Sequence, residues 1–234
     1  MKILAIDSSG LVASVAVLED DELIAEYTVN YKKTHSETLL PMLDEIKQMT
    51  NLELSSLDAI AVSKGPGSFT GLRIGSATVK GLAYALNIPV IPVPTVDALS
   101  MNLWGTEKLV CPIMDARRNQ VYTGLYEFVD NKHTVVMEQT AISVEELCAN
   151  LNKLNREVIF LGDGVPVYKE MIDSMITVER SYAPAGMNRQ RASSLGVMAF
   201  DYFAKGITET ADEHKPEYLR LSQAERERLA SHSV

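Results

Sequence analysis

One order of elements occurs twice along this chain of 234 residues. Each half begins with a short apolar run that ends in an aspartate, Asp7 or Asp115, and continues with a second β-like run, a helical stretch and a buried strand that opens onto glycines. The matching segments are 2–7 and 109–115, 12–18 and 121–128, 36–49 and 144–154, and 58–67 and 157–164. An internal repeat constrains the fold more strongly than any single motif. It predicts two similar lobes that face a cleft, with an aspartate at each first turn.

Each half is expected to fold as three strands, a helix, a strand and a second helix (βββαβα), with one lobe at residues 1–105 and the other at 106–234. Strands at 58–63 and 90–93 are separated by a helical pattern at 71–86. A connection of this length makes the two strands parallel and the crossover right-handed. The predicted class is therefore α/β, with mixed sheets flanked by helices.

The first long helix has two sequence features near its start. Ser36 is the expected N-cap, and Pro41 lacks a backbone donor, so the helix is expected to be kinked or to begin late. At the other end of the chain, the polar segment after Arg220 is expected to be a solvated helix or a frayed end.

Composition limits the classes of function. Hydrophobic residues make up 46% of the chain, which suffices for a packed core, and the net charge is −9. An acidic surface repels phosphodiesters, which argues against strong nucleic-acid binding by this chain alone. Two basic pairs could still form a local patch, although solvated surface charge is the favoured interpretation. These pairs are Lys32 with Lys33 and Arg117 with Arg118.

The cysteines and the apolar runs indicate a compartment. Cys111 and Cys148 show no metal or disulfide spacing, so inert packing in the core is expected. Asp7 interrupts the first apolar run, and no run approaches 18 apolar residues, so neither a signal peptide nor a membrane span is expected. We expect a cytoplasmic protein.

The glycine-rich segment at 65–75 is the most specific motif. It lacks the Gly-Lys-Ser/Thr of a Walker loop, and Thr70 replaces the last glycine of Gly-x-Gly-x-x-Gly. Glycines between a strand and a helix can nevertheless offer N–H groups to an anion. Arg73 falls in the first turn of the expected helix, where a positive charge is unfavourable because of the helix dipole, at a cost of roughly 0.3–1 kcal/mol. An acidic partner or a ligand is therefore expected. A tight turn with a salt-bridged Arg73 is the favoured alternative. The candidate anion- or nucleotide-proximal residues are Asp7, Gly65, Gly67, Arg73 and Asp115.

Small residues form a ridge on the helix that follows. Interior glycines cost about 1 kcal/mol each relative to alanine, so close packing must compensate, either within the chain or against a partner's helix. The apolar face of the preceding helix is the natural companion surface. The predicted partner interface comprises Leu39, Leu43, Ile46, Gly71, Ile74, Gly75, Thr78 and Leu82. Gly75→Leu and Leu43→Asp are expected to abolish partner binding without unfolding the chain.

The titratable residues define no catalytic site. Asp7 and Asp115 could reach metal-bound phosphates, but a strand-end aspartate that accepts from loop N–H groups is at least as well supported. The four histidines contain no i,i+3 or i,i+4 pair, so no local helical metal site is predicted. His35 beside Ser36 is a poor nucleophile–base geometry. No catalytic residue and no metal ligand is assigned.

Several motifs together resemble the TsaB (YeaZ) family, over nearly the whole chain. They are ILAIDSS at the start, HSETLLP from His35, GPGSFTGLRIG from Gly65, MDAR from Met114 and PEYLR from Pro216. The resemblance implies the bilobed fold of actin, Hsp70 and sugar kinases. It also implies a role with TsaD in making threonylcarbamoyladenosine on tRNA.

The resemblance further implies a non-catalytic paralogue of TsaD. The His-x-x-x-His pair that holds the TsaD metal has no counterpart, since Thr38 and Leu39 stand three and four residues after His35. Such a chain is expected to scaffold and activate TsaD through the two helices of the first lobe, to help recruit the ATPase TsaE, to pair with itself when alone and to meet tRNA indirectly. No cofactor is expected on the chain alone, although ATP or ADP is possible in the complex.

Two other functions stay open. An autonomous phosphotransferase or ATPase of the same fold is suggested by Asp7, Asp115 and the turn at 162–164. A peptidase acting on glycoproteins would need a metal or a nucleophile–base pair, which the local spacing does not supply.

Overall fold

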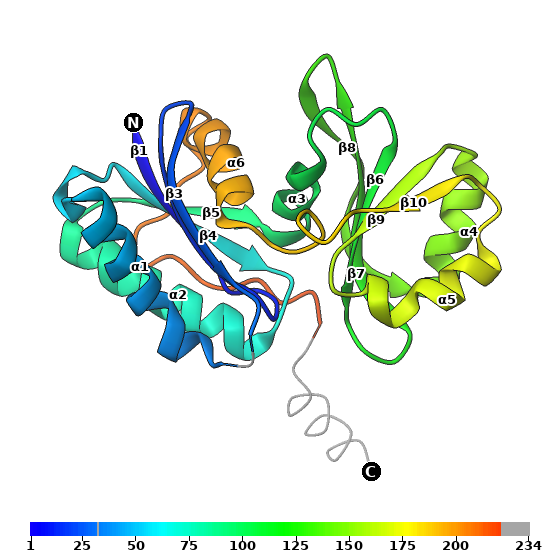
Figure 1. Cartoon of the computed structure of the whole chain (residues 1–234), viewed down its shortest axis with the longest axis horizontal. Coiled ribbons are helices and arrows are strands. Elements are labelled where there is room, and N and C mark those ends of the chain that lie inside the picture. The colour runs from blue at the N-terminus through cyan, green and yellow to red at the C-terminus, as the bar shows by residue number, and fades with distance from the viewer. Residues whose placement is uncertain (32, 221–234) are drawn as a thin grey trace, which may run out of the picture.

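The protein is described by a computed structural model, which covers residues 1–31 and 33–220. Two lobes lie side by side, each built on a five-stranded sheet (Figure 1). The strand order is β3-β2-β1-β4-β5 in the N-terminal sheet and β10-β9-β6-β7-β8 in the C-terminal sheet. Taken from its opposite edge, the second order repeats the first, which confirms the predicted duplication. The expectation for the segment after Arg220 lies outside the described residues.

The elements of the two halves correspond one to one. The first half contains β1 (Lys2–Asp7), β2 (Ala13–Glu19), β3 (Glu22–Val29), α1 (His35–Thr50), β4 (Ala59–Gly65), α2 (Phe69–Leu86), β5 (Val90–Pro94) and α3 (Thr95–Ser100). The second contains β6 (Leu109–Asp115), β7 (Gln120–Val129), β8 (Lys132–Ser143), α4 (Val144–Leu154), β9 (Val158–Leu161), α5 (Val165–Met175), β10 (Arg180–Tyr182) and α6 (Ala192–Ala204). Of these, β10 was not predicted, because three residues are too few to show a period.

Strand pairing is the same in both sheets. The first strand of each half, β1 or β6, pairs antiparallel with the strand after it and parallel with the fourth strand. The fourth and fifth strands are parallel in each half, as predicted for the pair β4 and β5. The first strand is therefore central, and its carboxyl end lies beside that of the fourth strand.

Helix α1 begins earlier than expected. Its N-cap is Thr34 rather than Ser36, and Thr34 and Glu37 form a capping box. Pro41 lies inside the helix, which runs from His35 to Thr50, so the predicted late start is wrong. Ser68 caps α2 by accepting from the Gly71 N–H at 3.2 Å.

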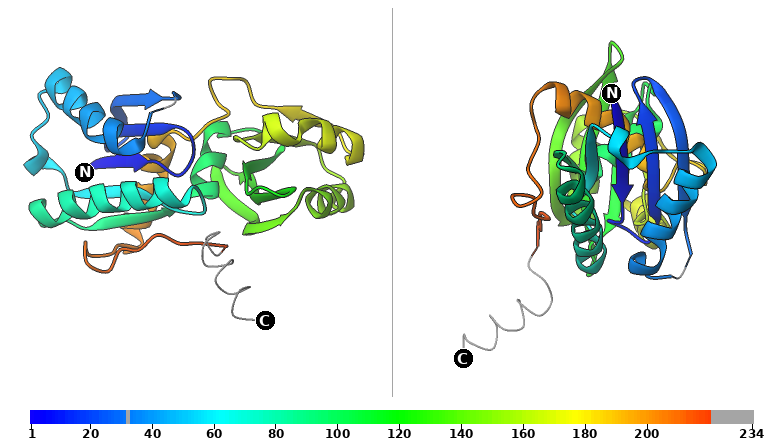
Figure 2. Two further views of the ribbon diagram at one scale, coloured as in Figure 1. Left: turned by 90° about the horizontal axis from the view of Figure 1, so that it is seen from below. Right: turned by 90° about the vertical axis from the view of Figure 1, so that its left-hand side faces the viewer.

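Packing divides the chain differently from the predicted lobes 1–105 and 106–234. Helix α6, from the second half, packs on β1, β2 and β5 of the N-terminal sheet, and α3, from the first half, packs on β6 and β7. Each half thus contributes one helix to the other half's sheet. No single position in the sequence therefore separates the two packed lobes. Helices α1 and α2 cover the opposite face of the N-terminal sheet (Figures 1 and 2). Within residues 1–31 and 33–220, no helix combines the length and the apolar character needed to cross a membrane.

Candidate functional site

The aspartates that end the first strands form equivalent turns. The Ser9 N–H donates to Asp7 Oδ1 at 2.9 Å, and the Arg117 N–H donates to Asp115 Oδ1 at 2.7 Å. Each carboxylate thus accepts from the backbone two residues ahead, which is the geometry of an Asx turn. The Ser9 hydroxyl also donates to Asp7, and the Tyr168 hydroxyl donates to Asp115 at 2.6 Å. Both carboxylates therefore stabilise their own loops.

The two carboxylates differ in environment. Asp7 is 1% exposed, and burial raises its pKa above the ordinary value although hydrogen bonds from Ser9 counteract part of the shift. Asp115 is exposed, and its N–H donates to Asp163 Oδ1 at 3.1 Å. Burial likewise raises the pKa of Asp163. The two halves therefore share the aspartate turn, but the carboxylate is buried in the first half and exposed in the second.

The glycine loop between β4 and α2 is packed against the protein itself. Gly65 has φ +124°, a conformation that favours glycine, and a Cβ there would overlap the Glu217 carbonyl oxygen. A Cβ on Gly67 would overlap the Ser9 carbonyl oxygen, which accepts from the Ser68 N–H at 2.7 Å. The Glu217 N–H donates to the Lys64 carbonyl at 2.6 Å. Close backbone approach within the chain therefore accounts for these two glycines.

The segment that covers this loop is residues 211–220, which we call the C-terminal strap. It contains the PEYLR motif and runs past α2 toward the C-terminal lobe (Figure 2). Lys64 Nζ and Glu217 Oε2 form an ion pair at 2.9 Å, and the guanidinium Nη1 of Arg220 donates to the Ala116 carbonyl at 2.6 Å. The strap thus joins both lobes.

Arg73 has a different partner from the one expected. Its Nε donates to the Tyr218 hydroxyl at 3.2 Å, and its guanidinium lies 3.8 Å from the centre of the Phe69 ring. Among the described residues it forms no ion pair, so the expected carboxylate is replaced by two aromatic rings.

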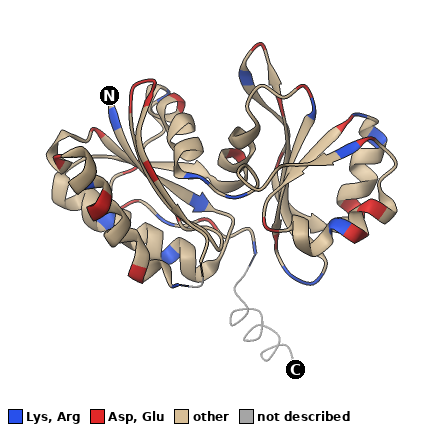
Figure 3. Ribbon diagram, in the orientation of Figure 1, with Lys and Arg blue, Asp and Glu red and all other residues tan. Residues whose placement is uncertain are grey.

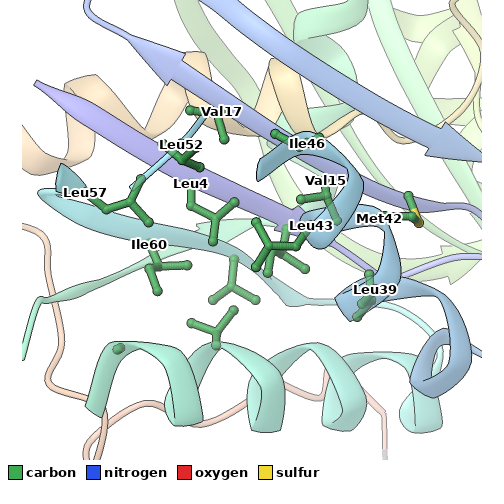
Figure 4. Packing of buried hydrophobic residues seen from close by; sticks show 14 of the residues in the cluster. Leu4, Val15, Val17, Leu39, Met42, Leu43, Ile46, Leu52, Leu57 and Ile60 are labelled. Carbon is green, nitrogen blue, oxygen red and sulfur yellow. The ribbon is translucent and has the colours of Figure 1, made fainter. Parts of the chain in front are cut away.

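The apolar residues predicted to meet a partner from α1 lie in the core of the N-terminal lobe instead. Leu39, Leu43 and Ile46 are 2%, 3% and 4% exposed. They point at the sheet and pack with residues of β1, β2 and β4 such as Leu4 and Ile60 (Figure 4). The assignment of these three side chains to a partner interface is therefore wrong, since the apolar face of α1 covers its own sheet.

The small residues of α2 divide between two faces. Gly71 and Gly75 are buried, and a Cβ on either would overlap Ser8, at its carbonyl oxygen or its hydroxyl. Ile74 and Leu82 are half-buried against the core, and the Thr78 hydroxyl donates to the Ile74 carbonyl at 2.9 Å. Gly71 and Gly75 thus allow close packing within the chain, which corrects their assignment to a partner interface.

The outward faces of α1 and α2 form a separate surface. Leu40 and Tyr84 are 53% and 75% exposed, and Gly81 has open space where a Cβ would be. We define the docking face as Leu40, Ala77, Gly81, Tyr84 and Ala85, all of which are exposed. The docking face combines small residues of α2 with two large apolar side chains, Leu40 of α1 and Tyr84 of α2.

A polar cluster between α3 and the C-terminal sheet was not predicted from the sequence. The Tyr126 hydroxyl donates to Asp97 Oδ1 at 2.6 Å, and burial raises the pKa of Asp97 to about 6. Ser100 Oγ lies 2.7 Å from His133 Nε2, and burial lowers the pKa of His133 to about 4. Ser100 is 0% exposed, so no substrate reaches its hydroxyl in this conformation. Residues so far apart along the chain give no local spacing signal.

Two simpler expectations concern cysteine and metal ligands. Cys111 and Cys148 are buried, as predicted, and burial raises the pKa of the Cys111 thiol to about 12. Over the described part of the chain, no three His, Cys, Asp or Glu side chains come together in a group that could hold a metal ion.

Known proteins are similar to this chain in sequence and in fold. A family model described as TsaD, tRNA N6-adenosine threonylcarbamoyltransferase, matches residues 22–228. A Bacillus subtilis protein, "tRNA threonylcarbamoyladenosine biosynthesis protein TsaB", is 35% identical over 227 residues, which is 96% of either chain. A solved Pseudomonas aeruginosa structure, described as an uncharacterized protein with similarity to the peptidase YeaZ, is 28% identical. Its TM-score is 0.81, and the match covers 94% of this chain and 99% of that one.

More distant likeness shows the fold alone. Component A of the (R)-2-hydroxyglutaryl-CoA dehydratase of Acidaminococcus fermentans is 12% identical, with a TM-score of 0.51 over 88% of this chain and 99% of that one. Together with the duplicated lobes, these similarities define a bilobed α/β protein of the actin/Hsp70/sugar-kinase type. Within that class, the chain belongs to the TsaB (YeaZ) family.

Proposed function

We propose that this chain is a non-catalytic subunit of the machinery that makes threonylcarbamoyladenosine on tRNA, and that it scaffolds and activates a TsaD-like transferase. The name of its Bacillus subtilis relative supports the pathway. The observation that carries the non-catalytic role is the packing of the strand ends against the protein's own turns and strap. Asp7 and Asp115 accept from their own turns, and Gly65 packs against the strap.

The docking face supports a role in binding a protein. Side chains such as Leu40 and Tyr84 expose apolar area that burial would stabilise by about 25 cal/mol per Å². Exposed small residues, Ala77 and Gly81, would let another helix approach the α2 backbone closely. We propose that a helix of the TsaD-like transferase packs here, and that a second copy of this chain uses the same face when no transferase is present.

The rest of the assembly follows from the family. We propose that the pair formed with the transferase recruits a TsaE-like ATPase, that the partner holds most of the tRNA and that the work takes place in the cytoplasm. ATP or ADP would be bound at the level of the complex and not by this chain alone.

Reconstitution by omission tests the function. TsaD, TsaE, tRNA, threonine, bicarbonate and ATP are combined with and without this chain, and the modified nucleoside is measured by mass spectrometry. Product should form only when the chain is present. Equal product in its absence would refute the scaffold role, and ATP turnover by the isolated chain would favour the phosphotransferase instead.

A further inference from the structure

The C-terminal strap aligns cations from both lobes along one side of the molecule. We propose that these cations form a contact for the phosphodiester backbone of RNA. The basic track, as we call it, comprises Arg73, Lys80, Arg117, Arg118, Lys215 and Arg220. Figure 3 shows basic residues on α2, on the strap and on the turn between β6 and β7.

Hydrogen bonds with the strap bring the cations together. Lys80 Nζ donates to the carbonyl oxygens of Asp212 and His214 at 3.3 and 3.2 Å. Arg73 Nε reaches the hydroxyl of Tyr218, four residues further along the strap. The track therefore follows α2 through the N-terminal lobe.

The last residue of the strap carries the track to the C-terminal lobe. Arg220 donates to the carbonyl of Ala116, which immediately precedes Arg117 and Arg118. Those two arginines are exposed and adopt φ values of 63° and 58° in a turn anchored by Asp115. The turn thus holds two exposed cations beside the end of the strap.

The charges of the track are available to a ligand. None of its six cations forms an ion pair among residues 1–31 and 33–220. Of the neighbouring acids, Glu217 is paired with Lys64. Glu213 accepts hydrogen bonds from Thr210 and keeps its negative charge, as do the exposed Asp212 and Asp115, so these three acids offset three of the six positive charges. Cations therefore outnumber acids on this side of a protein whose net charge is −9.

The shape of the site favours a strand over a small anion. A hollow of about 400 Å³ lies between α2 and the strap, lined by Arg73, Ser76, Ala77, Lys80, Lys215, Pro216 and Tyr218. It is open to solvent, and it shares Ala77 with the docking face, so a transferase bound there would border it. Arg220 and the β6–β7 turn lie further along the strap, beyond the lining residues, so the cations follow one another and surround no enclosed pocket. Point charges along an open groove suit the repeating phosphates of RNA. Because the whole chain is acidic, we expect this contact to be weak alone and to act once a partner holds the RNA, so the inference rests on the proposed function.

Two matched triple variants test the track. Arg117→Gln, Arg118→Gln and Lys215→Gln remove three track cations that make no side-chain bond to the strap. Lys132→Gln, Lys153→Gln and Lys205→Gln remove three exposed cations elsewhere, and each set changes the net charge from −9 to −12. Each protein is assembled with the TsaD-like transferase, assembly is verified by sedimentation, and tRNA binding is followed by fluorescence anisotropy from 50 to 300 mM salt.

The track variant should bind tRNA at least tenfold more weakly at low salt. The slope of log K against log salt should become shallower by about 0.7–0.9 for each phosphate that the variant no longer neutralises. The control should match the wild type. Equal tRNA binding by all three proteins, or equal weakening in both variants, would overturn the proposal.

Calorimetry with ATP is the second arm of the test. Loss of ATP binding with tRNA binding intact would indicate a small-anion site instead of an RNA contact. A track variant that no longer assembles with the transferase would assign the track to the protein interface and would also overturn the proposal. Failure of wild-type assembly, by contrast, would refute the proposed function.

Discussion

Two glycines of one helix should respond in opposite ways to the same added methyl group. In Gly71→Ala, the new Cβ would lie closer than 3.0 Å to the carbonyl oxygen of Ser8, a separation that real Cβ atoms essentially never show. In Gly81→Ala, the new Cβ would meet no atom within 4 Å. Gly71 lies in the first turn of α2 and Gly81 in its interior, so the gain in helix propensity from the added methyl group is no larger at Gly71 than at Gly81.

The magnitudes follow from that geometry. Alanine is about 1 kcal/mol better than glycine inside a helix, so Gly81→Ala should stabilise the protein by about that amount. For a domain of this size, that raises Tm by roughly 2–4 °C. At Gly71 any such gain is outweighed, because the obstacle is backbone and cannot rotate away. Overpacking costs about 1–3 kcal/mol and sometimes more, and the gain offsets at most about 1 kcal/mol of it, so we expect a net loss of up to about 3 kcal/mol and a lower Tm.

Thermal unfolding followed by circular dichroism, with urea titration as a second measure, would test this pair. Gly81→Ala should melt above the wild type, and Gly71→Ala should melt below it. If Gly71→Ala were as stable as Gly81→Ala, the close approach of α2 to the turn after β1 would be wrong.

Two further predictions concern buried groups. Between about pH 4 and 6, folded Asp97 keeps a proton that the unfolded chain has released, because its pKa is raised from 3.8 to about 6. The free energy of unfolding should therefore fall as pH rises through this window, by up to roughly 3 kcal/mol, and Asp97→Asn should remove that fall in urea titrations at several pH values. An unchanged pH profile in the variant would contradict the assignment. Leu43→Ala should cost about 2–5 kcal/mol, whereas Leu40→Ala, on the exposed side of α1, should change stability by less than about 0.5 kcal/mol. Comparable losses in urea titrations of both variants would argue against the orientation of α1.

The sequence predicted the fold well because its strongest signals are local. Apolar runs ending in Asp7 and Asp115 identified the repeated first strands. The length of the connection between β4 and β5 predicted that these two strands are parallel, as they are. The exchange of α3 and α6 between lobes could not be predicted, because the apolar pattern of a helix does not specify which sheet it covers.

The candidate interface was predicted less well, for a related reason. Periodicity finds the apolar face of α1, and an amphipathic helix normally turns that face toward its own core. Leu39, Leu43 and Ile46 follow this rule, because the sheet beneath α1 is apolar and needs a cover. The outward residues, such as Leu40 and Ala77, are single apolar positions on otherwise polar helix faces, so the sequence pattern does not mark them as a surface. They stand out once the exposure of each side chain is known.

The central claim is that the outward faces of α1 and α2 bind a TsaD-like transferase. The most direct test is the dissociation constant for that transferase, measured by calorimetry for Leu40→Asp, Ala77→Glu and the control Val167→Asp. Val167 is 56% exposed on α5 and lies outside the docking face. A charge buried without a partner costs about 3–5 kcal/mol, so each docking-face variant should bind at least ~100-fold more weakly while keeping the wild-type Tm. The control should bind normally. Wild-type affinity in both docking-face variants, or an equal loss in Val167→Asp, would contradict the account.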